Sequence, residues 1–171
     1  IQGQGVRLVA STGRGPVYAT SGFLGGIQPD YTIAFNGAYI MNREGTPLFA
    51  SPMSEEQFAV TESLGRQGHA LGYSFVDGYY IYHSPEKLVT LSGATLADSG
   101  SIHFNLDNQR HLKSLPYVAF CNYPDEMAER FNRDNPSMKM VYHRPNTYDL
   151  CQAAHNKATA AAWLLEHLGL G

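Results

Sequence analysis

The sequence predicts an α/β fold that is interrupted by a long α+β insertion, and three observations carry this prediction. An apolar strand, a weak helix and a second apolar strand follow one another near the start, which is the order of a parallel β-α-β unit. The middle of the chain instead contains hairpin signals, which are typical of antiparallel pairs. The final helix carries an apolar stripe, as a helix does when it packs against a sheet.

The first strand is predicted over Val6–Ala10, an apolar run closed by a glycine-rich turn, and it is expected to be buried and parallel. A weak helix is expected over Pro16–Leu24, with a Gly-Gly stop behind it. Tyr31–Phe35 is the second strand. Ligands of such units bind at the carboxyl ends of the strands, which here are Ser11–Arg14 and Asn36–Gly37.

The insertion is predicted from local turn and capping signals. Ser54–Gln57 is a capping box that begins a helix reaching about Gln67. Hairpins are expected for Ala38–Met41 with Thr46–Ala50, Leu71–Val76 with Tyr79–His83, and Met138–Tyr142 with Thr147–Cys151. A further strand and helix are expected at Tyr117–Cys121 and Pro124–Arg133, after a polar connector around Ser92–Ser101.

The last helix is predicted over Lys157–Leu168, with Ala160 and Leu164 on its apolar stripe and Gly169 as its stop. Three parts follow from this organisation: a partial α/β core at residues 1–46, an α+β domain at 47–153, and the return helix of the core at 154–171.

Composition sets further bounds on function. The chain has 171 residues, of which 43% are hydrophobic, enough for one good core or two small ones. Its net charge is −3 and no basic run occurs, so neither nucleic acid nor an anionic membrane is an expected partner. A small molecule or a protein is expected instead. Two cysteines without Cys-x-x-Cys spacing, and the absence of an export signal, predict a cytoplasmic protein.

Thr12, Gly13 and Arg14 form the first candidate site. A hydroxyl, a permissive glycine and backbone N–H groups at a strand end can hold an oxyanion, most often phosphate. The alternative is an ordinary turn in which Thr12 caps the next helix. The glycines near the start lack the Gly-x-Gly-x-x-Gly spacing after a strand, which makes a nicotinamide enzyme improbable.

Lys157 is the second candidate, because a cation at a helix N-terminus opposes the helix dipole. An anion bound there would give the ammonium group a role as a point-charge clamp. A solvated surface lysine is the alternative. Asn36 and Gly37 either present an amide to a ligand or simply make a turn. Scattered histidines without a His-Glu-x-x-His motif argue against a zinc site.

Four segments together resemble the Cof-type phosphatases of the haloacid dehalogenase superfamily. They are "LVASTGR", "AFNGAYI", "SPMSEEQF" and "HNKATAAAWLLEHLGL", in this order. Each is weak alone, but the ordered set is fairly specific and the similarity extends over the whole chain. The resemblance implies a partial Rossmann-like core with a large α/β cap of the C2 type, which selects the substrate.

The resemblance also implies roles for individual residues. The hydroxyl of Thr12 and the backbone of Gly13 would hold the transferring phosphoryl group, beside Arg14. Asn36–Gly37 would face the substrate. Lys157 would stabilise the charge of the phosphoryl group and of the nucleophile. The activity implied is a Mg²⁺-dependent phosphatase acting on small phosphorylated metabolites such as sugar phosphates.

The chain departs from this family pattern where the nucleophile is expected. Relatives carry Asp-x-Asp on the first core strand and a late Gly-Asp for Mg²⁺, and neither motif occurs here. The chain is therefore expected to be an internal segment, inactive alone, whose parent forms an aspartyl-phosphate on a residue outside it. The alternatives are a non-catalytic binding fragment, or a phosphotransferase or mutase of the same fold. The sequence does not predict the oligomeric state.

Overall fold

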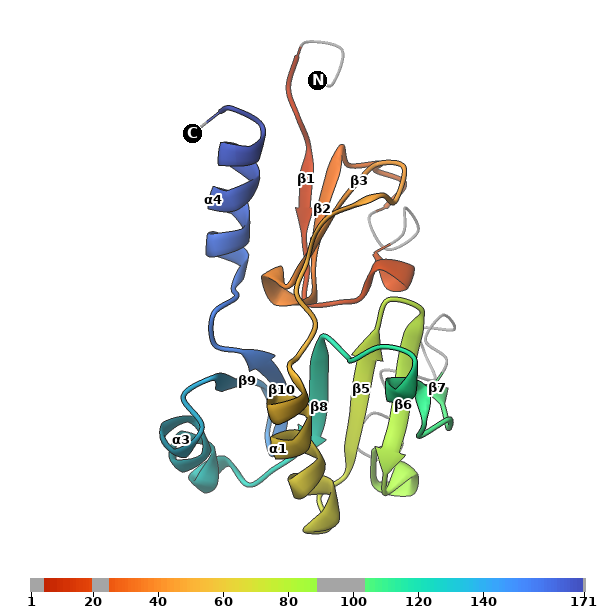
Figure 1. Cartoon of the computed structure of the whole chain (residues 1–171), viewed down its shortest axis with the longest axis vertical. Helices are drawn as coiled ribbons and strands as arrows, with labels where there is room; N and C mark the ends of the chain where they lie inside the picture. Colours follow the sequence, from red (N-terminus) through yellow and green to blue (C-terminus); the bar gives the residue numbers. More distant parts are fainter. Residues whose placement is uncertain (1–4, 20–24, 89–103, 171) are drawn as a thin grey trace. The chain divides into compact units, whose positions relative to one another are not determined.

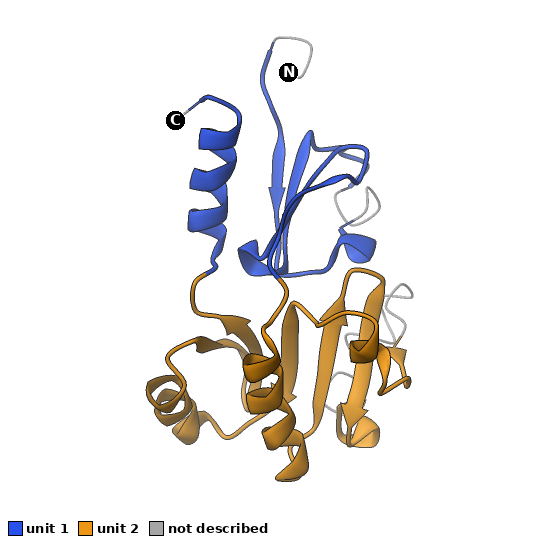
Figure 2. Ribbon diagram, in the orientation of Figure 1, with its two compact units in different colours: residues 1–51, 155–171 blue, residues 52–154 orange. Residues whose placement is uncertain are grey.

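The computed structural model describes residues 5–19, 25–88 and 104–170 (Figure 1). The chain divides into two compact units, one of residues 1–51 with 155–171 and the other of residues 52–154 (Figure 2). The polar connector expected around Ser92–Ser101 and the second half of the helix expected over Pro16–Leu24 lie outside the described residues.

The first unit contains a four-stranded sheet in the order β1-β2-β3-β4. Its strands are β1 Val9–Ser11, β2 Tyr31–Ala34, β3 Tyr39–Asn42 and β4 Pro47–Ala50. β1 and β2 pair in parallel, as the β-α-β pattern predicts, whereas the other neighbours are antiparallel. β4 belongs to this sheet, although the sequence pattern placed the start of the insertion at residue 47.

Two expectations for the start of the chain were wrong. The segment Pro16–Tyr18 forms a single 3₁₀ turn, η2, in place of the first turn of an α-helix. Val6 and Val9 are each 46% exposed, so the first strand is not buried. The reason is its position, because β1 is an edge strand of the described sheet and pairs with β2 alone.

Helix α4, Lys157–His167, packs against the sheet of the first unit (Figure 1). Ala160 and Leu164 are buried against Ile33 of β2 and Ile40 of β3, as the apolar stripe predicts. The helix ends before Gly169, whose φ of 67° lies in the left-handed region that terminates helices. The core of this unit is therefore a helix on one face of a small sheet.

The second unit contains a six-stranded sheet in the order β7-β6-β5-β8-β10-β9. Its strands are β5 Leu71–Phe75, β6 Gly78–His83, β7 Phe104–Asn105, β8 Val118–Asn122, β9 Met138–Arg144 and β10 Thr147–Gln152. The β5–β6 and β9–β10 hairpins are the two that turn signals predicted in this part of the chain. The short strand β7 and its parallel pairing with β6 were not predicted.

Helices α1, Glu55–Arg66, and α3, Asp125–Asp134, share one hydrophobic cluster with the sheet of the second unit. α1 begins at the predicted capping box, in which Ser54 and Gln57 bond to each other's backbone N–H groups. Tyr73 and Leu150 are fully buried in this cluster. A 3₁₀ turn, η4, covers Arg110–Leu112.

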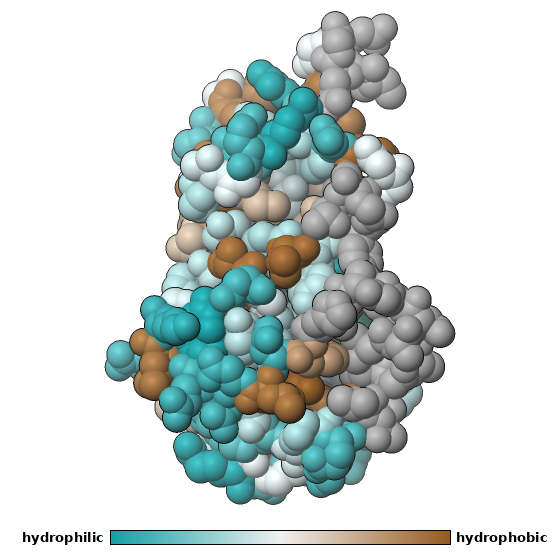
Figure 3. Space-filling model, turned by 90° about the vertical axis from the view of Figure 1, so that its right-hand side faces the viewer, coloured by the Kyte–Doolittle hydropathy of each residue, from teal (hydrophilic) through white to brown (hydrophobic). Residues whose placement is uncertain are grey.

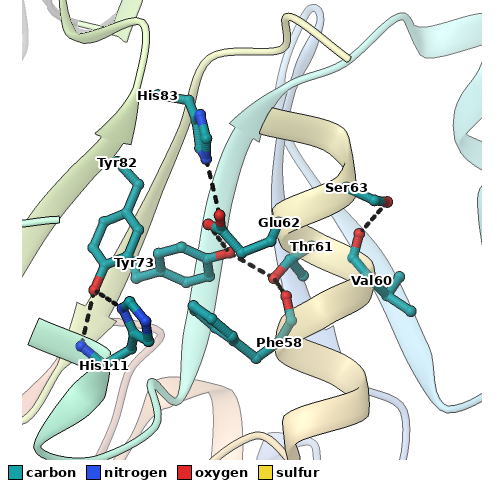
Figure 4. Close-up of polar contacts among 9 residues, drawn as sticks. All are labelled: Phe58, Val60, Thr61, Glu62, Ser63, Tyr73, Tyr82, His83 and His111. Atoms are coloured by element: carbon teal, nitrogen blue, oxygen red, sulfur yellow. Dashed lines mark hydrogen bonds and ion pairs between the residues drawn. The ribbon is translucent and has the colours of Figure 1, made fainter. Parts of the chain in front are cut away.

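A polar network lies inside this apolar layer, between α1 and the β5–β6 hairpin (Figure 4). The Tyr73 hydroxyl lies 2.8 Å from Thr61 Oγ1 and donates to Glu62 over 2.9 Å, and the other Glu62 oxygen meets His83 Nε2 at 3.0 Å. The His83 ring lies directly on the Cα of Gly65, where a Cβ would overlap it. The glycine inside α1 thus makes room for an imidazole.

Figure 3 shows one face of the molecule, on which hydrophobic residues occur in small separate groups among hydrophilic residues. Among the described residues, no helix is long and apolar enough to cross a membrane.

Candidate functional site

The loop that follows β1 is held in place by its own backbone and by β2. The Thr12 N–H donates to the Ile33 carbonyl over 2.9 Å, which extends the parallel pairing by one residue. Thr12 Oγ1 accepts a hydrogen bond of 3.1 Å from the Arg14 N–H. The hydroxyl therefore closes a turn within the loop, and η2 has no side-chain cap. Thr12 does not act as a helix cap.

The loop that follows β2 has an uncommon backbone conformation. The 3₁₀ turn η3, Phe35–Gly37, contains three consecutive residues with positive φ: 50° at Phe35, 56° at Asn36 and 109° at Gly37. For a bulky residue such as phenylalanine this region is rare and strained. Phe35 is buried, and its ring meets Tyr39 edge-on with centroids 6.2 Å apart. Packing thus compensates the strain at this strand end.

Backbone hydrogen bonds join the two strand-end loops. The Phe35 N–H donates to the Arg14 carbonyl over 3.1 Å, and the Asn36 N–H donates to the Thr12 carbonyl over 3.2 Å. The Asn36 side chain lies over Gly13, where a Cβ would come within 2.9 Å of its Oδ1. The amide of Asn36 is therefore in direct contact with the loop that carries the Thr12 hydroxyl.

The first turn of α4 meets the other side of η3. A Cβ at Gly37 would overlap the carbonyl of Asn156, so these two backbone segments are close because Gly37 has no side chain. Asn156 caps α4: its Oδ1 accepts from the N–H groups of Ala158 and Thr159, each over 2.9 Å. Lys157, the next residue, is the first of the helix and is exposed.

These contacts bring the predicted site residues to one end of the sheet in the first unit. Thr12, Gly13 and Asn36 form one contact group, Arg14 bonds to it through its backbone, and Gly37 ties it to the start of α4. This end is where the two parallel strands finish and where α4 begins (Figure 1). A strand-end hydroxyl, an amide and a helix N-terminus that carries a lysine can together bind an anion.

One contact of this region had no signal in the sequence. His155 Nε2 lies 2.9 Å from Ser51 Oγ, although the two residues are 104 positions apart. The sequence pattern treated His155 only as one of several scattered histidines. A covarying pair in an alignment would be the kind of signal that could reveal it.

The described residues do not provide a Mg²⁺ site. They contain no group of three or more His, Cys, Asp or Glu side chains arranged to hold a metal ion. The Glu62 carboxylate is occupied by His83 Nε2 and by the Tyr73 hydroxyl, and neither of these partners adds a second carboxylate. Since Mg²⁺ prefers several oxygen ligands, the chain as described does not fit this ion.

Comparison with known proteins shows which family this chain belongs to. The model of the haloacid dehalogenase-like hydrolases matches residues 1–171, the whole of the chain. The chain belongs to this family. No curated protein matches its sequence.

Several solved structures share the fold of this haloacid dehalogenase-like chain. A hypothetical protein from Geobacillus kaustophilus is 25% identical, with a TM-score of 0.79 over 99% of this chain and 65% of its own. A phosphatase of the superfamily from Bacteroides thetaiotaomicron is 15% identical, with a TM-score of 0.83 over 99% and 62%. A subclass IIB sugar phosphatase is 15% identical, with a TM-score of 0.78 over 99% and 65%. The chain spans less than two thirds of the length of these three proteins.

Proposed function

We propose that the protein containing this chain is a phosphatase that hydrolyses small phosphorylated metabolites, such as sugar phosphates. The observation that supports this most is the convergence of the Thr12 loop, Asn36 and the start of α4 at one end of a sheet. Family membership supports hydrolysis as the class of reaction. Two structural neighbours, a phosphatase and a sugar phosphatase, support the phosphate ester as the class of substrate.

Each residue of the site has a distinct proposed task. Thr12 Oγ1 accepts from the Arg14 N–H, so its own proton is available for a phosphoryl oxygen. The Gly13 backbone binds beside it, and the Asn36 amide faces the substrate. The Lys157 ammonium offsets the negative charge of the phosphoryl group as it passes to an aspartate outside this chain and then to water.

The remaining parts of the proposal concern the parent protein. Unit 2, residues 52–154, is proposed as the cap that selects the substrate and excludes water. Mg²⁺ stays a proposed cofactor of the parent, with ligands on segments outside these residues, because the described part holds no ligand cluster. A cytoplasmic location is proposed because Cys121 and Cys151 form no disulfide.

Substitution of Lys157 in the parent protein tests the proposal. Hydrolysis of p-nitrophenyl phosphate with Mg²⁺ should fall by about 10²-fold or more in Lys157→Ala, since removal of one charge-stabilising group costs that much in comparable sites. Lys113→Ala is the matched control, because this lysine is also exposed but lies in the other unit.

Three other results would change the conclusion. A near wild-type rate in Lys157→Ala would remove this residue from the site. Absence of turnover in the parent, with an intact mass that matches 171 residues alone, would favour a non-catalytic binding fragment. Transfer of the phosphoryl group to a second metabolite in place of water would indicate a phosphotransferase or mutase.

A further inference from the structure

The two chain connections at the edge of the first unit are joined by one side-chain hydrogen bond. The chain leaves this unit after Ser51 and re-enters it at His155. The serine hydroxyl and the imidazole Nε2 lie 2.9 Å apart. We call this pair the latch. Its two members stand on the segments that follow β4 and precede α4.

The latch closes a ring of contacts around the start of α4. The Ser51 N–H donates to the Ala38 carbonyl over 2.9 Å, and Ala38 follows Gly37 directly. Gly37 packs against the backbone of Asn156, and Asn156 follows His155. The ring therefore runs from Gly37 through Ser51 and His155 to Asn156 and back. It holds the residue that caps α4 from two directions.

The imidazole is fixed by packing as well as by its hydrogen bond. Its ring meets Phe49 edge-on at 5.5 Å between centroids, and Phe49 in turn meets Trp163 of α4 at 5.3 Å. Burial lowers the pKa of His155, so the neutral ring is the stable form near pH 7. In a hydrogen bond between a neutral imidazole and a hydroxyl, either group can be the donor, depending on the tautomer of the ring. The bond between Ser51 and His155 therefore forms without a charged histidine.

We propose that Ser51 and His155 are positioning residues that fix the first turn of α4 and thereby place Lys157 against the bound phosphate ester. This inference rests on the proposed function. The carbonyl of Asn156 accepts the first helical bond, from Ala160 over 3.0 Å, so any shift of Asn156 moves the start of the helix. A misplacement of about 1 Å at a reacting centre can cost about 10²-fold in rate, so a loosened turn is expected to lower kcat.

The test uses four variants of the parent protein. Ser51→Ala removes the hydroxyl, and His155→Phe removes the ring nitrogens but keeps an aromatic contact with Phe49. The third variant combines both changes. Ser51→Thr keeps a hydroxyl and should restore the wild-type behaviour. Ser63→Ala and His69→Phe are matched controls in the other unit, where Ser63 bonds to a carbonyl and the His69 ring lies 4.8 Å from that of Tyr123.

Two measurements are made on each variant. Each single variant should lower kcat by about three- to tenfold, the range expected for one neutral hydrogen bond, with KM nearly unchanged. Amide hydrogen exchange at residues 158–160 should quicken by a similar factor, whereas the first turn of α1 should not change. The double variant should equal either single one, because both changes break the same contact.

The possible outcomes distinguish failure of the latch proposal from failure of the proposed phosphatase function. Unchanged exchange at residues 158–160, or losses that add in the double variant, would overturn the latch even if the parent is an active phosphatase. Faster exchange with unchanged kcat would show that the latch orders α4 without positioning Lys157. A parent that hydrolyses no phosphate ester, with faster exchange in the variants, would refute the function and leave the latch as a structural device only.

Discussion

Gly37→Ala is the substitution that most directly probes how the site is assembled. The φ of Gly37 is 109°, a region that costs a residue with a Cβ about 1–3 kcal/mol. The added Cβ would also overlap the Asn156 carbonyl, and forcing an extra methyl group into such a packed contact costs about 1–3 kcal/mol more. The expected loss is therefore about 2–6 kcal/mol, a large part of the stability of an ordinary domain.

Gly45→Ala is the matched control for this prediction. Gly45 has a φ of 81°, but a Cβ there would meet no atom within 4 Å. It bears the backbone strain without the overlap, so the difference between the two variants isolates the contact with Asn156. Urea unfolding of the 171-residue chain can be followed by the fluorescence of Trp163, its single tryptophan, which lies on α4.

The expected midpoint of Gly37→Ala lies below that of Gly45→Ala by about 0.3–3 M urea, which is the overlap cost of about 1–3 kcal/mol divided by typical slopes of about 1–3 kcal/mol per molar. Equal midpoints for the two variants would refute the close approach of η3 and α4. A midpoint lower than that of Gly45→Ala would support it, because only Gly37 faces Asn156.

Three further predictions concern stability and reactivity. Tyr73→Phe should destabilise the second unit by about 1–3 kcal/mol, because it removes the buried hydroxyl that bonds to both Thr61 and Glu62. Tyr142→Phe, at an exposed position, should be neutral within about 0.5 kcal/mol in the same urea assay. Burial raises the pKa of the Cys121 thiol, so a thiol reagent such as Ellman's should modify it only after urea is added; rapid modification of the native chain would contradict this. Burial lowers the pKa of His155 from 6.5, so the unfolded chain binds this proton more readily, and the unfolding free energy should fall as the pH drops through and below about 6.5. The slope of the urea midpoint against pH should be smaller in His155→Phe, and an identical slope would refute the assignment.

Local signals in the sequence were enough to predict most elements of the fold. The capping box at Ser54, the Asp77–Gly78 turn and the apolar stripe of α4 each depend on residues close together in the chain. Such signals predict a local structure reliably because the residues that form it are close together in the sequence. The order of the parts followed from the same local signals, and the family comparison confirmed the resemblance to the haloacid dehalogenase superfamily.

The remaining features depend on contacts between distant segments. The exposure of Val9 follows from which strands flank β1, and no property of the strand itself reports that. The latch joins Ser51 to a histidine 104 positions away. The left-handed backbone at Phe35 is imposed by its burial and by a hydrogen bond to the Arg14 carbonyl. Tertiary context decides each of these, so a single sequence contains no pattern for them.

The position of the strain at η3 is itself an argument for a site. Two non-glycine residues, Phe35 and Asn36, adopt positive φ where a strand could have ended in an ordinary turn. The result of this conformation is that Asn36 lies on Gly13 and Gly37 lies on Asn156, so three separate segments meet through glycines that carry no Cβ. Strain that persists in a folded protein is overcome by the surrounding packing, and it gathers where geometry matters for binding or catalysis. Relaxing the η3 turn would separate the Thr12 loop from the start of α4, which is the arrangement on which the proposed phosphate site depends.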